Sequence, residues 1–327
     1  MKKILALLLT IVISLGLLAA CANDSDPTKI SVGYMSGPTG MGMAKLIHDN
    51  GGMEGNEKYS FNKYADTAAA KKDLETGAVN VICLPTNEAA NYYTANDNVV
   101  VLAINCLNSL YLLTDKNTTD VKSFSDLEGK TVYTCKNGTP RLVLEYIVKE
   151  MDMDITVSYT YDGKEIVTPN DLGTLVVAGS LPIAVMPEPI VTSSLLAIKK
   201  NANEDIAYTV DIDLADAWAE ICDTPVTMGC IVANAEFAEN NKEAIDAFLN
   251  EYKASIDFVG NVANLEDAST YIVEAGIMAA APAAKTALSN LGDAISYIDG
   301  AEMKSALTAF FDATNTTLPH DDFYYEK

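Results

Sequence analysis

Residues 30–47 read ISVGYMSGPTGMGMAKLI and contain a strand, a turn and the start of a helix, from which the architecture follows. Ile30–Tyr34 alternates as a strand does, and Ser36–Gly42 is rich in turn-forming residues. A helix is predicted to begin at Met43. Such a junction directs free backbone N–H groups and the positive end of the helix dipole above the loop, which favours anions or carbonyl-rich ligands. For this loop alone, a simple tight turn is the alternative.

The same order recurs along the chain. Thr67–Thr76 is predicted to be helical, Gly77–Leu84 is a glycine turn into a buried strand, and Pro85–Ala90 opens another helix behind a polar cap. Consecutive junctions of this kind line the ligand crevice of open α/β sheets. A dinucleotide-binding fold is the rival, because Asp66 follows a second strand-like run at a suitable distance. The glycines do not form GxGxxG, so this alternative is set aside.

A second unit of similar pattern begins beyond Asp115. Gly129-Lys130-Thr131 is similar to the end of a phosphate loop, but it feeds a strand and lacks the earlier glycine. Strands are predicted at residues 59–64, 99–105, 109–114, 131–133, 181–186 and 225–233. The later helices are predicted at residues 142–151, 171–178, 187–198, 237–259, 265–275, 281–291 and 301–313.

The N-terminus has the composition of a secretory signal. Met1-Lys2-Lys3 is positive, and the apolar run 4–20 is shorter than a membrane-spanning helix and ends in small residues before Cys21. Bacterial lipoproteins are cut at this pattern and acylated on the new N-terminal cysteine. We therefore predict a signal peptide over residues 1–20, lipidation at Cys21 and a flexible tether over 21–28. An ordinary signal or a short anchor, with an incidental cysteine, is the alternative.

Composition limits the class of protein further. Asp and Glu number 45 against 22 Lys and Arg, and the net charge of −23 repels nucleic-acid phosphates. Five cysteines besides Cys21 lack metal-ligand spacing, so no metal site is expected, and their odd number leaves at least one thiol free. A disulfide between Cys222 and Cys230 is left open. The five are Cys83, Cys106, Cys135, Cys222 and Cys230.

Taken in order, these motifs resemble the type II periplasmic-binding-protein family, in its branch for nitrate, sulfonates, taurine and thiamine-precursor pyrimidines. The cysteine-rich run of the thiamine-pyrimidine members is missing, which argues against that substrate. The resemblance extends over nearly the whole mature chain and is carried by residues 32–42, 74–81, 124–132, 186–189 and 318–325.

The resemblance implies an α/β fold of two lobes, in which two open sheets are joined by hinge strands and the C-terminus is helical. Lobe 1 would comprise residues 29–115 and 226–327, and lobe 2 residues 116–225. The implied partners are a small organic molecule or anion, a membrane permease and its cytoplasmic ATPase. We expect a monomer without a cofactor. Ligand contacts carried over by position, each with a helix-cap or turn role as its alternative, are Tyr34, Ser36, Thr39, Gly40, Thr86, Asn87, Gly138, Thr139 and Glu188.

Arg141 is the only arginine of the chain and stands near the start of a predicted helix. A guanidinium binds a carboxylate or sulfonate through two parallel hydrogen bonds, so Arg141 is a candidate contact for an acidic ligand. A surface arginine paired with Glu145 is the alternative. In that case a neutral or planar aromatic ligand fits the site better.

The sequence also bears on two function classes other than a transport receptor. An enzyme is not expected, because His48 and His320 are the only histidines and neither accompanies a recognisable nucleophile. A sensing or scavenging binding protein without its own transporter would carry the same sequence features, and it remains the alternative.

Overall fold

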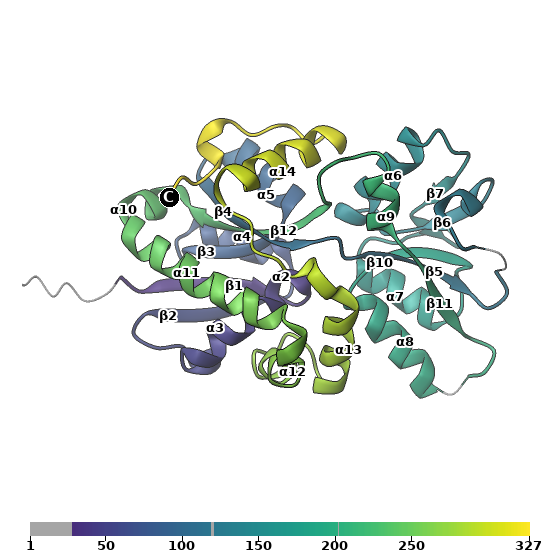
Figure 1. Cartoon of the computed structure of the whole chain (residues 1–327), viewed down its shortest axis with the longest axis horizontal. Coiled ribbons are helices and arrows are strands. Elements are labelled where there is room, and N and C mark those ends of the chain that lie inside the picture. The colour runs from purple at the N-terminus through teal and green to yellow at the C-terminus, as the bar shows by residue number, and fades with distance from the viewer. Residues whose placement is uncertain (1–27, 119–120, 202) are drawn as a thin grey trace, which may run out of the picture.

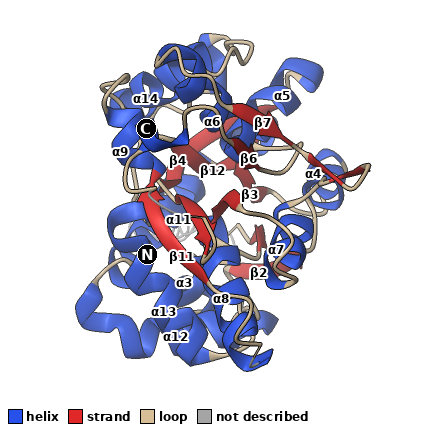
Figure 2. Ribbon diagram, turned by 90° about the vertical axis from the view of Figure 1, so that its right-hand side faces the viewer, coloured by secondary structure: helices blue, strands red, loops and turns tan. Residues whose placement is uncertain are grey.

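The structure is a computed structural model that describes residues 28–118, 121–201 and 203–327. Two α/β lobes lie side by side along the long axis of the molecule (Figure 1). Each lobe has a five-stranded sheet, and Figure 2 shows the strands of the two sheets lying among the helices. The predicted two-lobed α/β fold is confirmed. The predicted signal peptide, Cys21 and all of the tether except Thr28 lie outside the described residues.

The sheet of the first lobe has the strand order β2-β1-β3-β12-β4. β1 runs parallel to β2 and β3, whereas β12 is antiparallel to both β3 and β4. The strands are β1 (Ile30–Met35), β2 (Tyr59–Tyr64), β3 (Val81–Pro85), β4 (Val99–Leu107) and β12 (Thr227–Asn234).

Helices cover both faces of this sheet. One face packs against α3 (Ala44–Asp49), α11 (Lys242–Val259), α12 (Leu265–Glu274) and α13 (Ala281–Leu291). The other packs against α4 (Thr67–Glu75), α5 (Thr86–Asn96) and α14 (Gly300–Ala313). Two shorter helices, α2 (Pro38–Met41) and α10 (Ala235–Asn240), follow β1 and β12.

The sheet of the second lobe has the order β11-β5-β10-β6-β7. Its strands are β5 (Leu110–Asp115), β6 (Thr131–Tyr133), β7 (Thr156–Ser158), β10 (Ile183–Pro187) and β11 (Tyr208–Asp213), and a hairpin of β8 (Thr160–Tyr161) and β9 (Lys164–Glu165) stands apart. One face packs against α6 (Thr139–Glu150) and α9 (Leu214–Ala219), and the other against α7 (Pro169–Val177) and α8 (Ile190–Asn201).

The chain passes from the first lobe to the second between Leu107 and Leu110, and it returns just before Val226. The two passages are hydrogen-bonded to each other. The Asn108 amide donates to the Val226 carbonyl at 3.0 Å, and the Val226 amide donates to Asn108 Oδ1 at 3.0 Å. Asn108 has a φ of 33°, a conformation that asparagine tolerates better than most residues. Since β5 already belongs to the second sheet, the lobe boundary lies before the predicted position at 115.

One apolar core extends from lobe to lobe. Trp218 of α9 lies with its ring centroid 6.0 Å from that of Phe310 of α14 and 5.0 Å from that of Tyr146 of α6. Trp218 and Phe310 are buried, and the Trp218 indole N–H donates to the Thr224 carbonyl at 2.7 Å. Burying a side chain such as Phe310 contributes about 2 kcal/mol, so this contact holds the α14 side of the two lobes together.

Most predicted elements are confirmed, with a few differences. The predicted helix 237–259 is two helices, α10 and α11, because Asn241 leaves the helical region at φ −129°, ψ 39°. The elements that were not predicted are α2, β7, β11, α9 and the β8–β9 hairpin.

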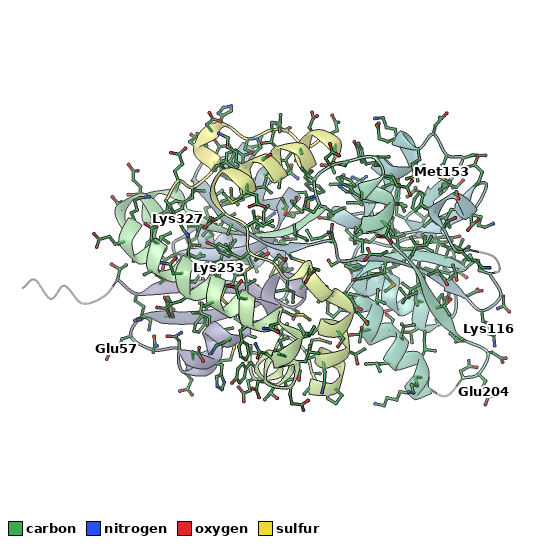
Figure 3. All side chains as sticks on the ribbon, viewed as in Figure 1. Glu57, Lys116, Met153, Glu204, Lys253 and Lys327 are labelled. Carbon is green, nitrogen blue, oxygen red and sulfur yellow. The ribbon has the colours of Figure 1, made fainter. Side chains whose placement is uncertain are left out.

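The charged side chains Glu57 and Lys253 on the first lobe and Lys116 and Glu204 on the second are exposed (Figure 3). Within the described ranges, every helix is too short or too polar to span a bilayer.

All five cysteines of the described residues are free, so the disulfide left open between Cys222 and Cys230 does not form. Cys222 is half-buried and the other four are buried. Burial raises the pKa of Cys83 and Cys106 to about 12 and that of Cys135 to about 11, and it raises the pKa of Cys230 as well.

The thiols should therefore differ sharply in reactivity. Because the thiolate is the reactive form, we expect the native protein from Ala22 onward, which lacks Cys21, to react rapidly at Cys222 alone at about pH 8, and the denatured protein to react at all five remaining cysteines. A colourimetric thiol assay measures both. Cys222→Ser should remove the rapid phase, and a rapid phase surviving in that variant would contradict the burial of the others.

Candidate ligand site at the lobe interface

Four strand-to-helix junctions, two from each lobe, lie where the lobes meet. In the first lobe these are the loop from β1 into α2 and the step from β3 into α5. In the second lobe they are the loop from β6 into α6 and the step from β10 into α8. The carboxyl ends of parallel strands in such sheets are where ligands bind, so this interface is the candidate site.

The N-termini of α5 and α6 meet across the interface. The Thr139 hydroxyl of α6 donates to Asn87 Oδ1 of α5 at 3.1 Å, and both side chains are buried. Gly138 precedes α6 at φ 93°, a conformation that L side chains rarely adopt. The first N–H groups of each helix lack intrahelical partners. Two positive helix ends are therefore directed at one place, which favours an anionic or acceptor-rich group there.

The loop after β1 closes the site from the first lobe. A Cβ atom at Gly37 would lie 3.8 Å from Pro189 Cδ of the second lobe, so the two loops lie close together. Ser36 is exposed at this loop. Gly40 is buried, and a Cβ there would lie 1.9 Å from the Met35 carbonyl oxygen, so this turn requires glycine.

Thr39 packs on the sheet beneath the loop. A Cβ at Gly229 of β12 would lie 2.1 Å from Thr39 Cγ2 and 2.8 Å from Asn105 Oδ1. The Asn105 amide of β4 donates to the Thr39 carbonyl at 3.2 Å and to the Tyr252 hydroxyl at 2.9 Å. The glycine thus permits α2 to approach the sheet, and Asn105 fixes its position.

Several buried polar atoms at these junctions lack a partner. Among the described residues, four of the six buried side-chain atoms without a hydrogen bond belong to the junctions or to the strands beside them. They are Thr86 Oγ1, Asn105 Oδ1, Thr227 Oγ1 and Arg141 Nε. An unpaired buried polar group destabilises the folded protein by about 1 to 3 kcal/mol. The binding of a polar molecule that formed hydrogen bonds with these atoms would therefore be favourable.

Glu188, predicted as a ligand contact, is engaged by protein groups. It is buried, and its carboxylate accepts hydrogen bonds from the Thr192 amide at 3.1 Å, the Thr192 hydroxyl at 2.8 Å and the Asn290 amide at 2.9 Å. Burial raises the pKa of Glu188, and the three donors oppose that shift. No cation is paired with it within the described residues.

Tyr34 lies away from the interface. Its side chain is fully buried in the core of the first lobe, and its hydroxyl donates to the Ala275 carbonyl at 2.8 Å. Burial also raises the pKa of this hydroxyl. Tyr34 was predicted to contact a ligand, but its side chain instead packs in the apolar core of the first lobe.

Arg141 is half-buried near the start of α6, with its guanidinium carbon 6.0 Å from the centre of the Tyr159 ring. The alternative ion pair with Glu145 is absent from the described residues, and Glu145 instead accepts the Tyr159 hydroxyl at 3.3 Å. Because its Nε atom is buried without a partner, Arg141 retains donor capacity for an anion.

The histidines lie outside the interface. His48 stacks on Tyr271 at 3.7 Å and bonds Glu274 at 2.8 Å on the outer surface of the first lobe, and His320 is exposed in the C-terminal segment. No group of three metal-ligating side chains occurs in the described part of the chain.

The close approach at Gly229 can be tested by substitution. We expect Gly229→Ala to destabilise the protein by roughly 1 to 3 kcal/mol, because overpacking forces Thr39 and α2 away from the sheet. Urea unfolding measures the change. Adding Thr39→Ser, which removes the methyl group in the way, should recover part of the loss. An unchanged free energy of unfolding in Gly229→Ala would contradict this packing.

No family model and no curated protein matches the sequence. Solved structures do match its fold. A crystal structure of an ABC transporter from Parabacteroides distasonis is 19% identical, covers 92% of this chain and 99% of its own, and has a TM-score of 0.71.

Two binding proteins with described ligands are also similar. The periplasmic aliphatic sulphonate-binding protein of Escherichia coli is 17% identical with a TM-score of 0.66, over 88% of this chain and 86% of its own. The periplasmic nitrate-binding protein of Synechocystis PCC 6803 is 14% identical with a TM-score of 0.61, over 89% and 81%. The chain therefore has the two-lobed fold that these binding proteins share.

Proposed function

We propose that this chain is an extracytoplasmic solute-binding protein of an ABC-type importer, anchored by a lipid at Cys21, which captures a small polar molecule between its lobes. The observation that carries the proposal is the meeting of the α5 and α6 N-termini, one from each lobe, at the Thr139–Asn87 contact. A receptor of this kind needs recognition groups from both lobes at one place. The similar structures described as transport and sulphonate- or nitrate-binding proteins support the assignment.

The chemistry of the interface favours an acceptor-rich ligand. Helix N-termini and an arginine with a free donor all stabilise negative charge. Glu188, the buried carboxylate of the interface, already accepts three hydrogen bonds and so offers little to a cationic ligand. We therefore place carboxylates, sulfonates and similar anions first among candidate solutes, ahead of uncharged polar molecules.

The protein from Ala22 onward, screened by thermal shift against carboxylates, sulfonates, amino acids, purines, pyrimidines and vitamins, tests this assignment. A solute at about 100 times its dissociation constant stabilises the folded state by about 2.7 kcal/mol, which raises the melting temperature by roughly 5 °C. One chemical class should give this rise. Silence across the panel from folded protein would count against the assignment.

If the screen identifies an acidic solute, that solute can be used to test the role of Arg141. We expect Arg141→Ala to abolish the thermal shift of that solute, because the anion loses a bidentate partner. Lys149→Ala is the matched control, since Lys149 is an exposed cation of the same helix whose only ion pair among the described residues is with Glu150. Equal affinity in the wild-type protein and Arg141→Ala would show that Arg141 does not contact the solute.

The lipid anchor has its own test. In a bacterial host labelled with a fatty acid, the full chain should carry label and sediment with membranes. Cys21→Ser should lose both, because the acylated position is gone, whereas Cys222→Ser should keep both. Label retained in Cys21→Ser would place the modification elsewhere.

A further inference from the structure

The two lobes touch on opposite sides of the crossing strands through contacts of different chemistry. On the α14 side the contact is apolar, through Trp218, Phe310 and Tyr146. On the other side α13 of the first lobe lies against α8 of the second, as Figure 1 shows, and this contact includes several hydrogen bonds. When the lobes separate, water can replace the partners of the polar contact, whereas separation of the apolar contact exposes its surface to water.

Asn290, in the last turn of α13, makes the polar contact. Its side-chain amide donates to Glu188 Oε1 at 2.9 Å and to Thr192 Oγ1 at 3.1 Å. Its backbone carbonyl accepts the Tyr111 hydroxyl at 2.9 Å. That carbonyl is one of the last four of the helix, which have no partner within it. The second lobe thus caps the C-terminal end of a first-lobe helix.

The partners of Asn290 are fixed within their own lobe. Thr192 donates to Glu188 through both its amide and its hydroxyl. The Glu188 amide donates to the carbonyl of Ser109, which is buried between β4 and β5 where the chain crosses between the lobes. The carboxylate is therefore held at a set distance from the hinge, and Asn290 reaches it only when the lobes are together.

We propose that Asn290 and Glu188 form a latch that holds the lobes closed, and that this latch favours the arrangement in which a solute is held. The lobes pivot about the crossing strands with the α14 contact intact, and opening separates α13 from α8. Since only the closed arrangement brings Asn87 to Thr139, the latch sets how much of the protein is ready to hold a solute. This last step rests on the proposed function, whereas the latch itself does not.

The latch is tested by replacing Asn290 in protein without any solute. Asn290 is exposed, so Asn290→Asp places a second carboxylate at the solvent edge of the buried Glu188 carboxylate, and the loss of the donor together with this repulsion should shift the ratio of closed to open molecules by more than about tenfold. Asn290→Ala removes the donor alone and should shift the ratio roughly tenfold. Small-angle X-ray scattering of the protein from Ala22 onward should show a larger radius of gyration for Asn290→Asp, with circular dichroism confirming that each variant is folded.

The matched controls decide between a latch and a general loss of packing. Ser289→Ala changes the neighbouring exposed residue, whose hydroxyl bonds only within α13 at Lys285, and it should scatter like the wild type. Asn290→Asp combined with Glu188→Gln restores a donor and acceptor pair with the roles reversed, and it should return the radius of gyration to the wild-type value.

Two results would overturn the latch. One is a wild-type scattering curve for Asn290→Asp, and the other is an expansion that Glu188→Gln fails to reverse. Neither result depends on finding a solute, so the scattering test remains valid even if the ligand screen finds no solute. Where a solute is known, Asn290→Ala should weaken its affinity by the factor by which the closed population falls.

Discussion

The crossing of the chain between lobes at Asn108 and Val226 is the constraint on which the rest of the structure depends. Their two mutual hydrogen bonds hold both passages in one register, although they belong to segments more than a hundred residues apart. β4 leads directly into the outgoing passage and the returning passage leads directly into β12, so the two sheets are placed relative to each other here. The strand ends that start α5 and α6 face one another because this register is fixed.

The apolar contacts and the hydrogen bonds between the lobes have different effects. Trp218 and Phe310 contribute apolar burial that does not depend on direction, so they maintain contact through small rotations of one lobe against the other. Hydrogen bonds such as Thr139 to Asn87 require a narrow geometry and are made or lost as a unit. The interface therefore combines an apolar contact with several hydrogen bonds, and the hydrogen bonds require one particular placement of the lobes.

Local sequence patterns were enough for most of the fold. The apolar run of β4 and the alternation of β1 predicted those strands, and amphipathic runs predicted the C-terminal helices within a residue or two. The β8–β9 hairpin was missed although Asp162-Gly163, both with positive φ, is a known hairpin turn pair. The break at Asn241 has no such local signal.

The site was harder to predict because strand alternation identifies two faces without saying which one is buried in which lobe. Tyr34 was expected at the ligand and lies in the core, since α11 and α12 cover its face of β1. Asn105 could have been identified from the sequence, because it is a lone amide within the apolar run of β4. Its hydrogen bond to the Thr39 carbonyl of α2 explains why an amide is present there. No sequence pattern identified Asn290, because its partners Glu188 and Thr192 are about a hundred residues away in the chain.

A chain with a net charge of −23 can still offer a place for an anion. At physiological ionic strength, charges on the outer surface are screened beyond about 8 Å, so residues such as Glu57 and Glu204 at the far ends of the lobes contribute little at the interface. Groups within the interface are screened much less. There the helix ends favour negative charge, while the Glu188 carboxylate is compensated by three donors. The proposed preference for an acidic solute therefore rests on the local potential at the interface rather than on the overall charge.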